Sequence, residues 1–215
     1  MAVKDDDFLL KEIEKFGDLV RGFFGIALEK DYEQEAAGLS KVLREKEKIN
    51  LHYYRDLSEE KLLREISSDA AFLPVKMKLI AEYMLQLAKD YPQYADSYKG
   101  KALILLFHMY KTSRGIISMD LLFKIERTVD DLEGALLTPP VFLIIFDFYF
   151  SNHKWAKAEN VLFSMVENDS FDKEKVKELG RSFYEKLLKL GEEELKEGDF
   201  SQVEVVQGLK DLEDA

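Results

Sequence analysis

The three histidines are the first residues to test for chemistry, because imidazole binds metal ions and transfers protons near neutral pH. His52, His108 and His153 lie in separate segments of the 215-residue chain. None has a second histidine, or a carboxylate at helical ligand spacing that also faces a predicted pocket, and no Glu-x-x-His pair of the di-iron bundles occurs. The sequence therefore predicts no metal site, and it predicts a core or half-buried position for His108.

Patterns that would supply a nucleophile or bind a phosphate are also missing from the sequence. Cysteine is absent, which excludes a thiolate nucleophile, a disulfide and a cysteine metal site. No G-x-S-x-G pattern occurs, and Ser58, Ser118 and Ser201 stand where helix N-caps are expected. Gly17 and Gly22 are not followed by the lysine and hydroxyl residue of a phosphate loop. We therefore expect no catalytic residue and no cofactor, and we predict that the chain is not an enzyme.

One carboxylate remains as a candidate binding residue. Asp147 is the only charged residue in the apolar run VFLIIFDFYF. Burying a carboxylate without a partner costs several kcal/mol. Asp147 must therefore face water, a hydrogen-bond donor or a ligand.

The elements that position Asp147 are two predicted antiparallel helices within Thr138 to Val166, joined by a tight turn at Ser151 to Lys154. Thr138 is a predicted N-cap, and Pro139 suits the first helical position because it has no amide hydrogen to leave unpaired. The first helix is so apolar that we expect burial on nearly every side. It is too short to cross a bilayer, which takes about 20 apolar residues.

This predicted hairpin resembles a tetratricopeptide repeat, which is a helical hairpin of about 34 residues. The resemblance covers about 30 residues. The alignment places apolar, aromatic or small residues at five pattern positions: Phe142, Ile145, Tyr149, Ala158 and Leu162. Phe146 stands where the repeat usually has a small residue, and Ser170 stands where it often has proline. The resemblance is therefore to a degenerate repeat.

In the repeat alignment, Leu143, Asp147 and Phe150 occupy the first-helix positions that line the concave face. The resemblance implies that these three residues form a partner-binding groove, with Asp147 pairing with a basic group of a bound peptide. The alternative is that the terminal helices of the chain fill the groove and that Lys154 or Arg181 pairs with Asp147.

The rest of the chain continues the helical pattern. Another apolar helix followed by an amphipathic one is predicted from Tyr94 to Val129. We therefore predict an all-α fold, a tetratricopeptide-like helical-hairpin array of the α-α superhelix class. Residues 1–215 are expected to form a single domain, with an opening hairpin at 1–48, a tetratricopeptide-like body at 58–168 and capping helices at 171–215. Further helices are predicted at 74–90 and 172–190, a connection at 49–57 and a short turn at GEEELKEG.

The order of these parts resembles a bacterial family of uncharacterised helical proteins. The segments that carry the resemblance are DFLLKEIEKFGDLVRGFFG, KWAKAENVLFSMVEN and SFYEKLLKLGEEELKEGDFSQVEVVQGLKDLE. The resemblance spans most of the chain and implies no activity or site.

The opening helix offers a second surface for interaction. Four phenylalanines on its predicted apolar stripe form a candidate assembly face: Phe8, Phe16, Phe23 and Phe24. If this face paired across a two-fold axis, the chain would be a homodimeric, self-assembling structural protein.

Charge limits the partners that we expect. The formal net charge is −11, and residues Gly191 to Ala215 contribute nine acidic against two basic residues, a net −7. This balance repels nucleic acid and anionic membranes. The N-terminus MAVKDDDFLL lacks the pattern of a signal peptide, so we expect a cytoplasmic location. The leading prediction is a non-enzymatic protein-interaction or scaffold module that binds a protein or peptide, the alternative is the self-assembling protein, and an enzyme without a recognisable site is third.

Overall fold

The computed structural model describes residues 50–68, 74–112 and 119–215, and these residues form helices, turns and loops with no strand among them. The predicted all-α class is confirmed. The chain divides into two compact units, Met1–Leu121 and Leu122–Ala215. The predicted single array, with its opening hairpin, body and capping helices, stays a prediction.

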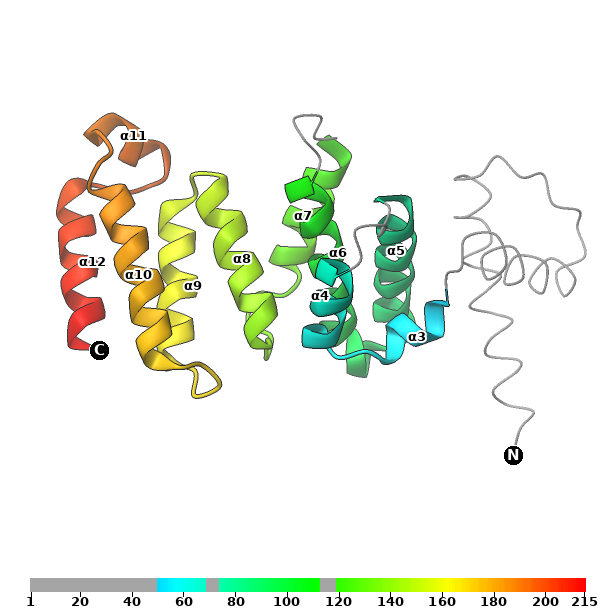
Figure 1. The fold of residues 1–215 in the computed structure, drawn as a ribbon. Helices are drawn as coiled ribbons and strands as arrows, with labels where there is room; N and C mark the ends of the chain where they lie inside the picture. The colour runs from blue at the N-terminus through cyan, green and yellow to red at the C-terminus, as the bar shows by residue number, and fades with distance from the viewer. Residues whose placement is uncertain (1–49, 69–73, 113–118) are drawn as a thin grey trace, which may run out of the picture. The chain divides into compact units, whose positions relative to one another are not determined.

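Unit 1 is built around the long helices α5 and α6, which pack against each other, while α4 packs on α6 and α3 on α5 (Figure 1). Its described elements are α3 (Leu51–Asp56), α4 (Glu59–Ser68), α5 (Pro74–Asp90), the 3-10 turn η1 (Pro92–Tyr94) and α6 (Ala95–Thr112). Helix α5 begins at Pro74, as predicted. Proline suits the first turn of a helix because it has no amide hydrogen to leave unpaired there.

Short helix α3 corrects the prediction of a plain connection at residues 49–57. Asn50 begins it, and its side chain accepts a hydrogen bond from the Tyr53 amide at 3.3 Å. Tyr54 is its one fully buried residue. A helix of six residues with a single buried position shows no helical period in the sequence, which explains the wrong prediction.

Unit 1 also buries polar groups that find partners within it. The Lys101 ammonium on α6 donates a hydrogen bond to the Arg55 carbonyl oxygen at 2.7 Å, next to the C-terminal end of α3. The Ser97 hydroxyl donates to the buried Glu59 carboxylate at 2.8 Å. Burial lowers the pKa of Lys101, while the charge of Glu59 opposes that shift. These contacts tie α3 and α4 to α6.

In unit 2, helices α8, α9, α10 and α12 run side by side (Figure 1). The unit boundary falls inside α7 (Met119–Asp130), and the later elements are α8 (Pro139–Ser151), α9 (Trp155–Glu167), α10 (Lys173–Leu187), α11 (Glu192–Glu197) and α12 (Gln202–Asp214). The predicted hairpin at 138–166 is confirmed as α8 and α9. No helix in the described part of the chain is long and apolar enough to cross a membrane.

Two N-caps predicted from the sequence lie in the described part of unit 2, Thr138 and Ser201, and only Ser201 makes its capping hydrogen bond. Asp172 accepts hydrogen bonds from the amides of Glu174 and Lys175, and Ser201 accepts one from the Glu204 amide. Thr138 lies at the N-cap of α8 as predicted, but its hydroxyl makes no capping bond and is buried without a partner in the described structure. The cap position was therefore predicted correctly, and its hydrogen bond was not.

Helix α11 corrects the predicted turn at GEEELKEG. Three glutamates occupy its first turn, where the helix dipole favours negative charge. The Glu194 carboxylate accepts a hydrogen bond from the Gly191 amide at 3.0 Å, and Leu195 is fully buried. The first-turn glutamates and the buried Leu195 thus account for a short helix at this position.

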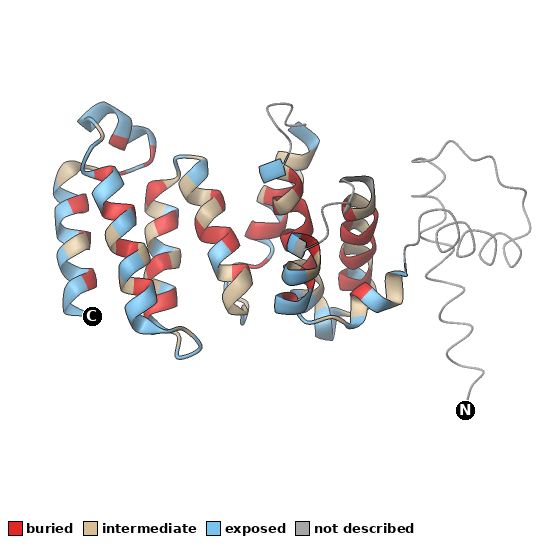
Figure 2. Ribbon diagram, viewed as in Figure 1, coloured by how far each residue is buried: buried red, intermediate tan, exposed pale blue. Residues whose placement is uncertain are grey.

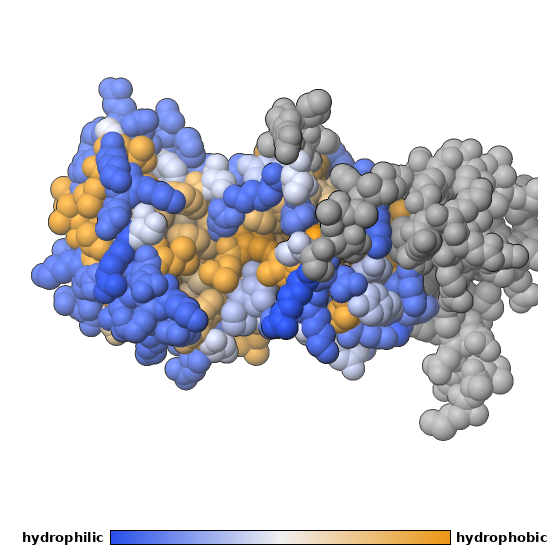
Figure 3. Space-filling view, viewed as in Figure 1, coloured by the Kyte–Doolittle hydropathy of each residue, from blue (hydrophilic) through white to orange (hydrophobic). Residues whose placement is uncertain are grey.

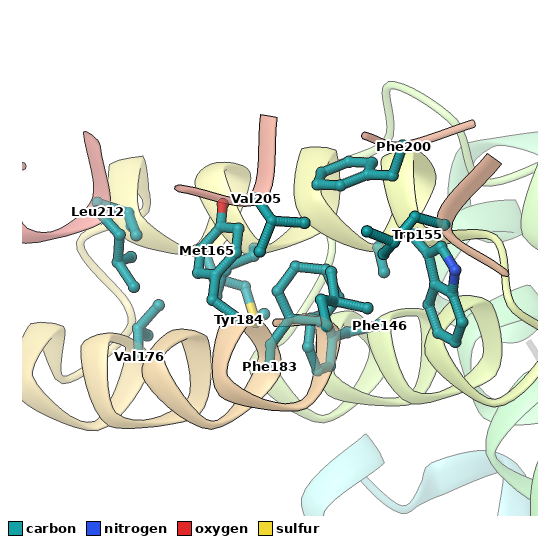
Figure 4. Packing of buried hydrophobic residues seen from close by; sticks show 14 residues of the cluster. Phe146, Trp155, Met165, Val176, Phe183, Tyr184, Phe200, Val205 and Leu212 are labelled. Carbon is teal, nitrogen blue, oxygen red and sulfur yellow. The ribbon is translucent and has the colours of Figure 1, made fainter. Parts of the chain in front are cut away.

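The core of unit 2 lies between α8, α9, α10 and the two C-terminal helices. Figure 4 shows Phe183 from α10 next to Phe146 from α8, and their ring centroids lie 5.6 Å apart in an edge-on contact. The buried Tyr184 hydroxyl donates to Glu159 at 2.5 Å, and Gly208 on α12 leaves room for both groups. The C-terminal helices therefore complete this core.

Candidate binding site

A half-open pocket of about 390 Å³ lies within unit 2, between the end of α7, the loop that follows it, α8 and α9. Its apolar lining is contributed by Val129, Leu132, Leu137, Phe142, Ile145 and Val161. Its polar lining is contributed by Glu133, Tyr149, Lys157, Asn160 and Ser164. Pockets that hold small ligands measure roughly 300 to 1,000 Å³, so this one has the size of a binding site.

The loop at residues 131–138 forms one wall through consecutive turns. The Leu132 amide donates to the Val129 carbonyl at 3.0 Å, and the Ala135 amide donates to the Leu132 carbonyl at 3.1 Å. Gly134 has a φ of 77°, in the left-handed region where residues with a Cβ are strained. Leu136 follows with its side chain 99% exposed. The loop therefore presents an apolar side chain to solvent beside the pocket.

Helix α8 supplies the opposite wall with Phe142, Ile145 and Tyr149, whose spacings of three and four place them on one face. The repeat alignment assigned these residues to pattern positions and gave no sign that they line a pocket. Phe142 also packs edge-on against Phe171, with ring centroids 5.7 Å apart. The charge pattern VDDLEG beside the apolar hairpin was the signal in the sequence that could have indicated this site.

Burial and three acidic side chains affect the ionisation of the Tyr149 phenol. Burial and the negative charges of Asp130, Glu133 and Glu126 raise the pKa of Tyr149 to about 12. Glu126 pairs with Lys154 at 2.8 Å. On the α9 side, the Lys157 ammonium lies 5.3 Å from the centroid of the Tyr149 ring, within cation–π distance. The pocket thus has an apolar floor and a charged rim.

The predicted groove residues Leu143, Asp147 and Phe150 lie along a neighbouring side of α8. Leu143 is 45% exposed, and Figure 3 shows apolar side chains gathered on the surface over α8. Asp147 is half-buried and accepts a hydrogen bond from the Ser151 hydroxyl at 3.2 Å. Arg181, one of the two cations considered as a partner for Asp147, binds Glu213 with a nitrogen–oxygen distance of 2.5 Å.

Phe150 is half-buried and packs against other aromatic rings of unit 2. Its ring centroid lies 5.5 Å from that of Trp155 and 5.7 Å from that of Phe183. The Lys186 ammonium from α10 lies 4.9 Å from the same ring. The structure therefore joins Phe150 to the core of unit 2 and leaves Leu143 at the surface.

His153, a further candidate residue, does not line the pocket. His153 has a φ of 58° and stacks on Trp155, with ring centroids 4.8 Å apart. No group of three or more potential metal ligands occurs among the residues that the structure describes. Ser118 and the predicted assembly face lie outside the described residues, the latter comprising Phe8, Phe16, Phe23 and Phe24.

The fold and the pocket define an all-helical protein with a ligand-sized pocket in its second unit. The chain belongs to a family of unknown function (DUF6483), whose profile matches residues 3–215. This agrees with the predicted membership of an uncharacterised helical family. No curated protein and no solved structure matches the chain.

Proposed function

We propose that the chain is a non-enzymatic protein-interaction module that binds a segment of a partner protein in the pocket beside α8 and α9. The observation that carries this proposal is the half-open apolar pocket of about 390 Å³. The predicted tetratricopeptide-like stacking, a bacterial source and a cytoplasmic location belong to the same proposal.

Two neighbouring features support a protein segment as the ligand. Leu136 beside the pocket and Leu143 on the adjoining side of α8 are 99% and 45% exposed. A contiguous exposed apolar patch often marks an interaction surface, and Figure 3 shows apolar side chains gathered over α8. An extended segment seated in the pocket would reach Leu136 with one flank and Leu143 and Asp147 with the other.

The proposal is tested by panning a phage library of random peptides on the full-length chain and on two tryptophan variants. Asn160 is an exposed residue of the pocket lining, so Asn160→Trp places a bulky ring at the pocket. Glu167→Trp is the matched control, because Glu167 is exposed on the same helix and does not line the pocket. Circular dichroism of both variants confirms that the helices are retained.

We expect the wild-type chain and Glu167→Trp to enrich the same peptides and Asn160→Trp to lose them. Failure of the wild-type chain to enrich any peptide would overturn the proposal. Enrichment that Asn160→Trp leaves unchanged would overturn it as well, because the peptides would then bind elsewhere.

A further inference from the structure

The charge of the chain is concentrated in the unit that holds the pocket. Residues 122–215 contain 21 acidic and 12 basic residues, a net charge of −9, whereas the whole chain carries −11. A ligand that approaches unit 2 therefore meets a negative field, which favours cationic ligands and speeds their association at low ionic strength.

The same sign of charge recurs at the rim of the pocket. Asp130 ends α7 and Glu133 lies in the loop that forms the pocket wall, and both side chains are exposed. In the described part of the chain neither has an ion-pair partner, whereas Glu126 pairs with Lys154. Both carboxylates lie close enough to Tyr149 to act on its phenol. Glu133, which lines the pocket, and Asp130, which directly follows the lining residue Val129, form an acidic edge on the loop side of the pocket.

The opposite edge has a cation of its own. Lys157 lies over the Tyr149 ring from the α9 side, so the position beside that ring is already taken by a positive charge. A bound cation is therefore directed toward Asp130 and Glu133, while the apolar floor at Phe142 and Ile145 remains for an apolar side chain.

From this arrangement we infer that the occupant of the pocket is a basic protein segment in which a lysine or arginine stands beside a large apolar residue. The apolar residue fills the floor, and the cation pairs with Asp130 and Glu133 at the loop edge. This inference rests on the proposed function and adds the chemistry of the partner.

The experiment begins with the peptides that the wild-type chain enriches from the random library. Their sequences are expected to contain a lysine or arginine within two positions of a large apolar residue, above the frequency in the unselected library. One such peptide is synthesised with a fluorescent label, and its dissociation constant is measured by anisotropy for the wild-type chain and for two double variants.

The first double variant, Asp130→Asn with Glu133→Gln, neutralises the acidic edge. We expect it to weaken binding roughly fivefold, which is typical for the loss of exposed ion pairs, and to reduce the salt dependence of binding. The second, Glu193→Gln with Glu197→Gln on α11, makes the same change in net charge at exposed residues outside the pocket lining. It is expected to bind the peptide nearly as the wild-type chain does.

The possible results separate the two proposals. Peptides that lose binding with Asn160→Trp but show no basic residue, or bind equally well after neutralisation of Asp130 and Glu133, would overturn the inference and leave the proposed function standing. An equal loss in both double variants would also overturn it, because general charge rather than the acidic edge would then bind the peptide. Absence of any peptide that depends on the pocket would overturn the proposed function itself.

Discussion

Helices α6 and α8 are each the apolar helix of a predicted hairpin, yet the two units bury them differently. In unit 1 every residue of α6 from Gly100 to Phe107 is buried, including Lys101. In unit 2 only five residues of α8 are buried, while Phe142, Tyr149 and Phe150 are half-buried and Leu143 is exposed. Figure 2 shows α8 in a mixture of red, tan and pale blue.

Hydrophobicity does not explain the difference. Helix α6 contains four charged residues and α8 contains one, so the more apolar helix is the less buried. Unit 1 packs α4 and α5 against α6. Helix α8 packs mainly against α9 and the core beyond it, and the loop at 131–138 covers its other side only in part. Among the described residues, α6 is thus packed against two helices of its unit, whereas one side of α8 borders the pocket.

The two units also differ in whether their polar side chains are buried or exposed. In unit 1, Lys101 and Glu59 are buried and bind partners within the unit. Around the pocket of unit 2, Asp130, Glu133 and Lys157 are exposed at a rim. A closed polar cluster stabilises a fold, whereas polar groups at the rim of an apolar pocket are available to orient a ligand.

The largest expected effect compares one leucine from each helix. Leu105 on α6 is fully buried, so Leu105→Ala should lower the free energy of unfolding by about 2–5 kcal/mol through lost burial and a new cavity. Leu143 on α8 is 45% exposed, so Leu143→Ala should cost less than about 1 kcal/mol. Urea denaturation followed by circular dichroism measures both, and Trp155, the single tryptophan, reports unit 2 separately by fluorescence.

A cost for Leu143→Ala as large as that for Leu105→Ala would break the comparison. It would show that another part of the chain covers this side of α8 in solution. A small cost for Leu105→Ala would instead show that the core around α6 closes over the lost volume.

Much of the fold could be predicted because the signals that define it are local. Pro74 and the Thr138-Pro139 pair mark helix starts, and Ser201 acts as an N-cap where the sequence predicts it. Helices α3 and α11 were missed because each has one buried residue, Tyr54 and Leu195, and one buried residue shows no period.

The pocket could not be predicted in the same way. Phe142, Ile145 and Tyr149 have the spacing and residue types of packing positions, and a sequence pattern does not reveal whether a neighbouring helix or a loop covers such a face. The predicted groove was identified from repeat geometry, which places Phe150 on the same side as Leu143 but does not show the contacts that Phe150 makes with Trp155 and Phe183.

A prediction of intermediate size tests whether unit 2 is closely packed outside its pocket. Gly198 follows α11 and lies so close to the Trp155 ring and the His153 carbonyl that a Cβ would collide with both. Gly198→Ala should therefore lower the stability of unit 2 by about 1–3 kcal/mol through overpacking. Gly191→Ala is the matched control, since its Cβ would make only an ordinary contact with Glu194.

Tryptophan fluorescence during urea denaturation measures both glycine variants. If Gly198→Ala is as stable as Gly191→Ala, the core around Gly198 and Trp155 accommodates an added methyl group without loss of stability. The contrast between a closely packed core and an open pocket would then fail within unit 2.

The smallest effect concerns the charges that surround Tyr149. Its pKa is raised from 10.0 to about 12 by burial and by Asp130, Glu133 and Glu126. A raised pKa in the folded state means that the neutral phenol stabilises the fold fully below pH 10.0 and that this contribution is lost as the pH rises toward about 12. Tyr149→Phe should therefore resist alkaline unfolding better than the wild-type chain in that window, with little difference at neutral pH.

Tyrosine ionisation is followed by near-ultraviolet absorbance as the pH is raised. The ionisation phase that is present in the wild-type chain and absent in Tyr149→Phe is assigned to Tyr149. Asp130→Asn with Glu133→Gln should move the phase assigned to Tyr149 to lower pH, because two of the charges that oppose its ionisation are gone. Glu193→Gln with Glu197→Gln, which changes the net charge equally, should leave it in place. If the two double variants shift the phase alike, Asp130 and Glu133 affect the Tyr149 phenol no more than the glutamates on α11 do. The contrast between the buried polar groups of unit 1 and the exposed charges at the pocket of unit 2 would then fail.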